Sequence, residues 1–190
     1  YPHEFFVASM SMELSNQKKL SEFYEELKRL NINIIRPDIN KCYADFTSDG
    51  KNFLYALGAI KSVGFDAISK IVEERTKNGE YVDLNDFINR TNPKNINKLQ
   101  LEGLVKAGAF DNFNKNRQSL YNSIPNIILK SKNIFENNSA NQIDLFNEDN
   151  DQTYIENIED WNTDVKLSKE FETLGFFISD HPLNQYQSLF

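Results

Sequence analysis

The residues best suited to a chemical role form a short turn, Lys61-Ser62-Val63-Gly64, that leads into an amphipathic stretch. Gly64 can adopt a positive φ without steric cost, which tight turns often require. At the start of the next helix, outward N–H groups and the helix dipole would favour a phosphate, and Lys61 stands just before them. This pattern is typical of a helix-hairpin-helix, which holds DNA by its backbone. An ordinary joint between two helices fits the same residues.

A second turn of this kind, Lys106-Ala107-Gly108-Ala109-Phe110-Asp111, follows another apolar stretch with helical spacing, 96–106. The two turns indicate a loose internal duplication. Paired hairpins related by a pseudo-two-fold axis could grip both strands of a duplex, whereas either one alone would bind weakly.

Residues for catalysis or metal binding are not grouped in this sequence. It contains no clustered carboxylates, no Ser/His/Asp set, no Cys/His pair and no phosphate-binding P-loop. The two histidines, His3 and His181, each stand beside a proline and are interpreted as structural. We therefore expect no catalytic residue, metal ligand or cofactor in this chain.

The charge distribution permits nucleic-acid binding, although the net charge of −7 argues against it at first. Residues 61–132 carry 12 basic and 8 acidic side chains, whereas residues 133–190 carry 2 basic and 12 acidic ones. The middle of the chain is therefore mildly basic and the acidic excess lies near its end.

Length and composition bound the class of protein. The 190 residues suffice for one or two domains with a core, and mean hydropathy is −0.58. No apolar run approaches the roughly 20 residues that span a bilayer. The single cysteine, Cys42, excludes an intramolecular disulfide. We expect a cytoplasmic chain without membrane contact, and Tyr1 in place of Met suggests a piece of a longer protein.

The fold class expected is mainly α, with a small β-hairpin and a tandem helix-hairpin-helix core. Apolar spacing predicts helices, with the ranges 1–12, 20–30, 65–76, 84–90, 96–106, 117–129 and 164–178. Ser15 or Asn16 could cap the second helix and Asp83 the fourth. Gly103 lies inside a helix, where glycine costs about 1 kcal/mol relative to alanine. Two aromatic-rich runs, 42–47 and 52–57, flank an Asp-Gly pair that predicts the β-hairpin.

From about 132 to 162 the sequence is rich in Asn, Asp and Glu and lacks periodicity, which predicts a linker or flexible loop. Within it lies Gln142-Ile143-Asp144-Leu145-Phe146. Leu145 and Phe146 could anchor in a shallow pocket of a partner, with Gln142 at its rim. The alternative is that both apolar side chains fold back onto the domain.

Several short motifs follow one another in a specific order. They are Tyr1-Pro2-His3-Glu4-Phe5, Pro37-Asp38-Ile39-Asn40, Gly58-Ala59-Ile60-Lys61, Lys106 to Asp111, Gln142 to Phe146, Leu174-Gly175-Phe176-Phe177 and His181-Pro182-Leu183. Together they resemble family C, the bacterial replicative DNA polymerases, over essentially the whole chain.

This resemblance implies a position within a large enzyme. Residues 1–58 would end the polymerase fingers, 59–132 would form the tandem helix-hairpin-helix, 133–163 would be the acidic linker, and 164–190 would lead to an absent OB-fold. The catalytic carboxylates and their Mg²⁺ would lie in a palm outside this chain. The implied partners are primer–template duplex DNA, the sliding clamp and other replicase subunits.

The resemblance also implies roles for individual residues. Two sets are implied: phosphate contacts from Lys61, Ser62, Val63, Gly64, Lys98, Lys106, Ala107 and Gly108, and clamp contacts from Gln142, Asp144, Leu145 and Phe146. Two positions depart from the family pattern. Ser62 stands where glycine is usual, so we expect a tighter or differently shaped turn, and Leu99 stands where a second basic residue often follows Lys98.

Two other functions remain open at this point. The chain could be a non-catalytic helix-hairpin-helix module of a repair or adaptor protein, or part of the translesion paralogue in the same polymerase family. A palm with paired Asp residues upstream would favour a polymerase.

Overall fold

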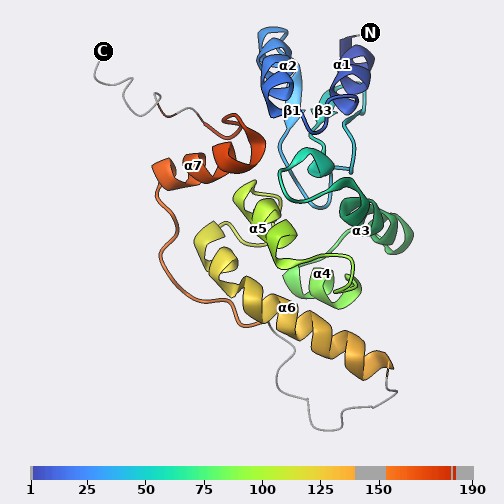
Figure 1. Ribbon diagram of the computed structural model, residues 1–190, viewed down its shortest axis with the longest axis vertical. Coiled ribbons are helices and arrows are strands. Elements are labelled where there is room, and N and C mark those ends of the chain that lie inside the picture. The colour runs from blue at the N-terminus through green and yellow to red at the C-terminus, as the bar shows by residue number, and fades with distance from the viewer. Residues whose placement is uncertain (1, 140–152, 181, 183–190) are drawn as a thin grey trace.

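The computed structural model describes residues 2–139, 153–180 and 182. The predicted clamp-binding residues, 142–146, lie outside the described residues. The structure confirms a mainly helical fold with one small sheet (Figure 1). The elements are α1 (Pro2–Ser11), α2 (Gln17–Arg29), β1 (Asn33–Ile35), β2 (Thr47–Ser48), β3 (Asn52–Leu54), the 3-10 helix η1 (Leu57–Ala59), α3 (Phe65–Asn78), α4 (Leu84–Arg90), α5 (Lys98–Lys106), α6 (Arg117–Ser139) and α7 (Thr163–Leu174).

Helices α1 and α2 lie at one end of the molecule and α6 lies at the other, with α3, α5 and α7 between them (Figure 1). Helix α2 buries Leu20, Tyr24 and Leu27, the face that the sequence predicts. Of the two proposed caps it uses Asn16, whose side chain accepts a hydrogen bond from Lys19 N at 3.3 Å. The periodicity thus places this helix correctly.

The sheet contains the predicted hairpin and one further strand. β2 pairs with β3 in antiparallel register, and β1 pairs with the other edge of β3 in parallel register. In the β2–β3 turn, the Asp49 carboxylate accepts hydrogen bonds from Lys51 N at 2.9 Å and Asn52 N at 2.6 Å. The strands are shorter than the aromatic-rich runs, and Phe46 and Tyr55, just outside them, are buried in the core.

The predicted linker differs from the structure at both of its ends. Residues 133–139 continue α6, so the expected boundary at 132 falls inside a helix. Residues 153–162 form no regular helix or strand and bond to other elements. Thr153 N donates to Asn85 Oδ1 at 2.8 Å, and Asn116 Nδ2 donates to the carbonyl of Ile158. Polar composition concealed this docking because many of the contacts are hydrogen bonds, to which Ile155 and the ring of Trp161 add packing.

One hydrophobic core joins the units that the sequence analysis separates. Its buried residues come from α1 through α6 and from Leu174, Phe176 and Ile178 at the end of α7. The ring of Phe176 stacks on Tyr24 at 4.5 Å between centroids. The C-terminal part of the described chain therefore packs directly against α2.

Candidate nucleic-acid interface

The first predicted turn has a backbone with two left-handed residues. Ser62 has φ 68° and Gly64 has φ 81°, while Val63 between them is fully buried. Ser62 thus adopts a positive φ, which glycine adopts more readily, and the expectation of a tighter or differently shaped turn stays a prediction. Val63 anchors the turn in the core, and Lys61, Ser62 and Gly64 are exposed.

This turn presents backbone donors to solvent. Lys61 N donates to the carbonyl of Thr173 and Val63 N to that of Ile60, whereas the N–H groups of Ser62 and Gly64 make no hydrogen bond within the described chain. Gly64 is the N-cap of α3 and provides no capping side chain. The exposed N–H groups and the start of α3 thus form a positive end that an anion can contact. Asp66 in the first turn of α3 lowers this potential.

Helix α5 packs against the inner side of the first turn. A Cβ on Gly103 would lie 2.9 Å from Val63 Cγ2 and 3.0 Å from the Lys61 carbonyl oxygen. Gln100 Nε2 donates to the Val63 carbonyl at 2.8 Å. These contacts bring the start of α5 beside the first turn, so Lys98, which is exposed, lies near it. Gly103 permits this close approach, which explains a residue that is unfavourable in a helix.

The second turn has a different surface. Gly108 has φ 81°, but Ala107 and Gly108 are buried. The N–H groups of Ala107, Gly108 and Ala109 all donate to carbonyls of α5. A Cβ on Gly108 would lie 2.2 Å from Arg117 Nη2, so the guanidinium group covers the glycine. The second turn therefore offers no unpaired backbone donor at these three residues.

Lys106, a predicted phosphate contact, is buried in an ion pair. Its Nζ lies 2.8 Å from Glu172 Oε1 and 5.5 Å from the centre of the Tyr121 ring. The hydrogen bond from Lys106 is the main reason that the pKa of Glu172 is lowered. Lys98 keeps an exposed side chain, with Nζ 3.7 Å from Glu102 Oε1.

Two basic residues that the sequence analysis missed lie beside the second turn. Arg36 and Lys41 line a hollow of about 390 Å³ together with Gly108 and Asp38, and Lys41 Nζ lies 3.7 Å from Asp38 Oδ2. A hydrogen bond of 2.9 Å from Ile39 N to the Ala109 carbonyl holds their segment against the turn. No local motif marks these residues, because their position depends on a contact between distant parts of the chain.

A buried ion cluster lies directly behind the second turn. Arg117 donates to Asp111 through Nε at 2.8 Å and Nη2 at 2.7 Å, and through Nη1 to Glu170 Oε1 at 3.1 Å. Burial by itself would lower the pKa of Arg117, but the bonds to Asp111 and Glu170 outweigh burial and raise it. This guanidinium group stays charged and belongs to the interior.

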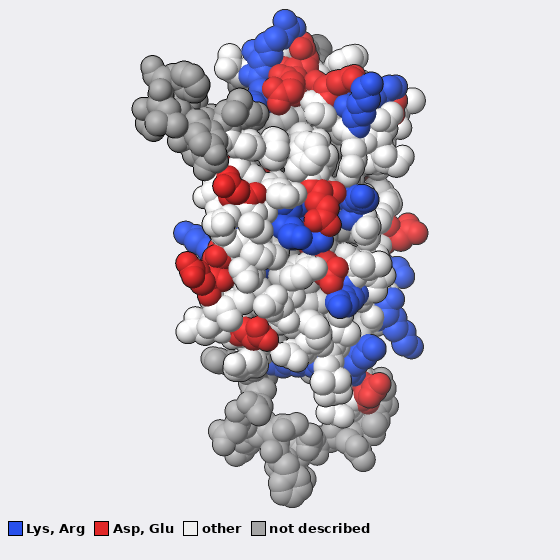
Figure 2. All heavy atoms as spheres, turned by 60° about the vertical axis from the view of Figure 1, so that its left-hand side comes forward, with Lys and Arg blue, Asp and Glu red and all other residues white. Residues whose placement is uncertain are grey.

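The charges on the face that carries α7 are mixed. Figure 2 shows blue and red side chains lying next to one another across this face. Part of this mixture is the ion pair between Lys106 and Glu172. The mildly basic composition of 61–132 therefore does not form a broad positive surface here, and contacts to an anion depend on the two turns.

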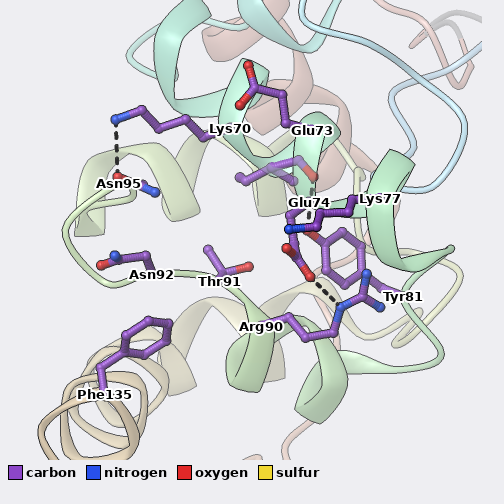
Figure 3. Close-up of a pocket in the computed structure, with 11 residues that line it drawn as sticks. Lys70, Glu73, Glu74, Lys77, Tyr81, Arg90, Thr91, Asn92, Asn95 and Phe135 are labelled. Carbon is purple, nitrogen blue, oxygen red and sulfur yellow. Dashed lines mark hydrogen bonds and ion pairs between the residues drawn. The ribbon is translucent and has the colours of Figure 1, made fainter. Parts of the chain in front are cut away.

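A further hollow of about 440 Å³ lies between α3 and the segment after α4 (Figure 3). Its lining includes three basic and two acidic side chains, of which Arg90 and Glu74 form an ion pair. Arg90 Nε donates to Glu74 Oε1 at 3.0 Å, and Lys70 Nζ donates to Asn95 Oδ1 at 3.3 Å. Glu73 and Glu74 thus offset most of the positive charge of Lys70, Lys77 and Arg90 in this hollow.

Two further features are absent from the described residues. None of their helices is both long and apolar enough to cross a membrane. Within 2–139, 153–180 and 182, no three His, Cys, Asp or Glu side chains are grouped to hold a metal ion.

Comparison with known proteins places these turns in context. Residues 31–120, which contain both turns, match the family described as a helix-hairpin-helix motif. The chain is 37% identical over 184 residues to DNA polymerase III subunit alpha of Caulobacter vibrioides, covering 96% of this chain and 16% of that protein. Identity is 36% over 195 residues to the Campylobacter jejuni subunit, covering 98% of this chain and 16% of that protein. Identity to the Escherichia coli K12 subunit is 34% over 193 residues, which cover 98% of this chain and 17% of that protein.

Proposed function

Because this chain belongs to the DNA polymerase III alpha subunit family, as a segment spanning 16–17% of the relatives compared, we propose that it holds duplex DNA for a DNA-directed DNA polymerase. The single observation that supports this role most strongly is the first turn. There, two exposed left-handed residues present unpaired N–H groups at the start of α3. Nucleotidyl transfer would take place in another part of the parent protein.

The proposed contacts differ between the two turns. At the first turn, the N–H groups of Ser62 and Gly64 bind a phosphate, and Lys61 and Lys98 add positive charge. At the second turn the N–H groups are used internally, so Arg36 and Lys41 provide the contact instead. Because these donors reach the phosphate backbone, binding is independent of sequence.

Duplex binding by the 190-residue chain tests this proposal. Fluorescence anisotropy with two duplexes of unrelated sequence should give equal affinities that fall steeply with salt. Replacing Lys61 and Lys98 together by alanine should lower the slope of log K against log salt by about 2, since each phosphate contact contributes roughly 0.9. Arg36→Ala with Lys41→Ala should have a similar effect at the second turn.

The matched control is Lys28→Ala with Lys51→Ala, which removes the same charge from α2 and the β2–β3 turn. It should leave the slope nearly unchanged. Absence of duplex binding at low salt would reject the proposal, and an equal loss in the control would reject the assignment to the turns. Circular dichroism of each variant checks that it is folded.

We also propose that the chain attaches to a sliding clamp through four residues: Gln142, Asp144, Leu145 and Phe146. Its support is the sequence: two large apolar residues stand in a polar, acidic stretch. Leu145→Ala with Phe146→Ala should abolish capture by an immobilised sliding clamp, whereas Asn150→Ala should not change it. Undiminished capture by the double variant would exclude this segment as the attachment site.

A further inference from the structure

We propose that α7 couples the two turns and that Glu170 is the positioning residue of this coupling. The inference rests on the proposed function, because it explains how two separate phosphate contacts keep a fixed spacing. Helix α7 contacts the first turn through Thr173 and the Arg117 side chain under the second turn through Glu170, and α5 lies between the two turns in the chain.

The contact with the first turn is made at the end of α7. The carbonyl of Thr173 accepts a hydrogen bond from Lys61 N at 3.0 Å and another from Gln17 Nε2 at 3.1 Å. The chain leaves the end of α7 at Gly175, which has φ 83°. A Cβ there would lie 2.9 Å from Gln17 Cβ. The Thr173 carbonyl is therefore held at one position, and Lys61 is held with it.

The contact with the second turn is made one helical turn earlier. Glu170 is completely buried, and its Oε1 accepts from Arg117 Nη1 at 3.1 Å. Its Oε2 accepts from Ser179 N at 3.2 Å. Arg117 in turn donates to the Lys106 carbonyl and lies directly against Gly108. The position of α7 thus determines where the guanidinium group sits under the second turn.

Glu170 and Thr173 are three residues apart and lie on neighbouring turns of one short helix. A rigid helix with a buried ion pair at one point and a backbone hydrogen bond at the other transmits a displacement between them. If Glu170 loses its charge, Arg117 keeps only Asp111 as an acidic partner, and α7 keeps only the more exposed ion pair of Glu172 with Lys106 at the second turn. The first turn then loosens as well, although no contact of its own has been altered.

Hydrogen exchange of the DNA-free chain tests the coupling without assuming any DNA binding. In Glu170→Gln, the amides of Gly108 and Ala109 should exchange at least about tenfold faster, and those of Lys61 and Val63 should also accelerate severalfold. The amide of Tyr55, bonded to Ile35 in the sheet, serves as the internal reference. Lys166→Ala breaks a more exposed ion pair of α7 with Asp160 and should leave both turns unchanged.

Two outcomes would overturn the coupling: acceleration confined to the second turn, or equal acceleration at Tyr55. If Glu170→Gln does not fold, the milder variant Glu172→Gln decides in the same way. It removes the partner of Lys106 from a half-exposed position on α7. Faster exchange at both Gly108 and Lys61 supports the coupling, and an unchanged Lys61 rejects it.

Measurements of duplex binding provide a second test of the coupling. Lys61→Ala should cost several times less affinity in the Glu170→Gln background than in the original chain, because the turns no longer act as one unit. Strictly additive losses would overturn the inference while leaving the proposed function intact. If the original chain binds no duplex, the proposed function fails, and the exchange result still decides whether α7 couples the turns.

Discussion

At the scale of single residues, Ser62 and Gly64 determine what the first turn can bind. A serine at positive φ costs on the order of 1 kcal/mol relative to glycine, and the buried Val63 between the two residues holds this backbone in place. The result is a pair of N–H groups on exposed residues that make no hydrogen bond within the described chain. The turn therefore keeps two unpaired N–H donors with serine at this position, and the strain of the serine lowers the free energy of unfolding.

This interpretation predicts little change in stability for Ser62→Gly and a loss of stability for Gly64→Ala. Ser62→Gly relieves the strain but makes the unfolded chain more flexible, so the free energy of unfolding should stay within about 1 kcal/mol of the original. Gly64→Ala introduces strain at φ 81° and ψ 147°, and should cost about 1–3 kcal/mol. Urea unfolding measures both values. A Gly64→Ala variant as stable as the original would show that the turn is not held as described.

At the scale of elements, the packing of α5 on the first turn depends on Gly103. Alanine at this position would gain about 1 kcal/mol of helix propensity. Its methyl group would press on Val63 and the Lys61 carbonyl, and overpacking typically costs about 1–3 kcal/mol. Gly103→Ala should therefore lower the free energy of unfolding by about 1 kcal/mol in urea. A more stable variant would mean that α5 does not press on the turn.

The β2–β3 turn gives a prediction for acid pH. Hydrogen bonds from the Asn52 side chain, the Asn52 backbone and the Lys51 backbone lower the pKa of Asp49 from 3.8 to about 2. Because the pKa is lower in the folded state, Asp49 stabilises the fold fully above its ordinary value, and this stabilisation is lost as pH falls through the folded pKa.

The measurement compares Asp49→Asn with the original chain at several pH values. The stability difference should be largest near neutral pH and should shrink between about pH 4 and pH 2. Lys41→Ala is the control, because it leaves every hydrogen bond of Asp49 in place. A stability difference that stays constant across this range would show that the carboxylate charge is not responsible.

At the scale of the whole molecule, a single core unites the described helices and sheet. The chain should therefore unfold in one transition. Its only tryptophan, Trp161, packs on Tyr121 in the segment beside α6, with ring centroids 5.4 Å apart. In urea, tryptophan fluorescence and far-UV circular dichroism should give the same midpoint. An earlier fluorescence transition would mean that residues 153–162 detach before the core unfolds.

Local signals were sufficient to predict most of the elements. Apolar periodicity located α2, α3 and α5, and Asp83 caps α4 as its side-chain chemistry predicts. The β2–β3 turn followed from Asp49-Gly50. Parallel pairing of β1 with β3 was not predictable, because it joins segments with no periodic pattern that links them. The docked segment 153–162 was missed for the same reason.

The sequence by itself determined the helical class, both glycine turns and the resemblance to a polymerase family. These features depend on residue type and on spacing within a few positions. Only the tertiary structure decided which basic side chains face solvent. Lys106 is buried against Glu172, whereas Arg36 and Lys41 lie beside the second turn. The physical reason is that side-chain exposure and ion pairing are set by neighbours distant in sequence, here above all by α7.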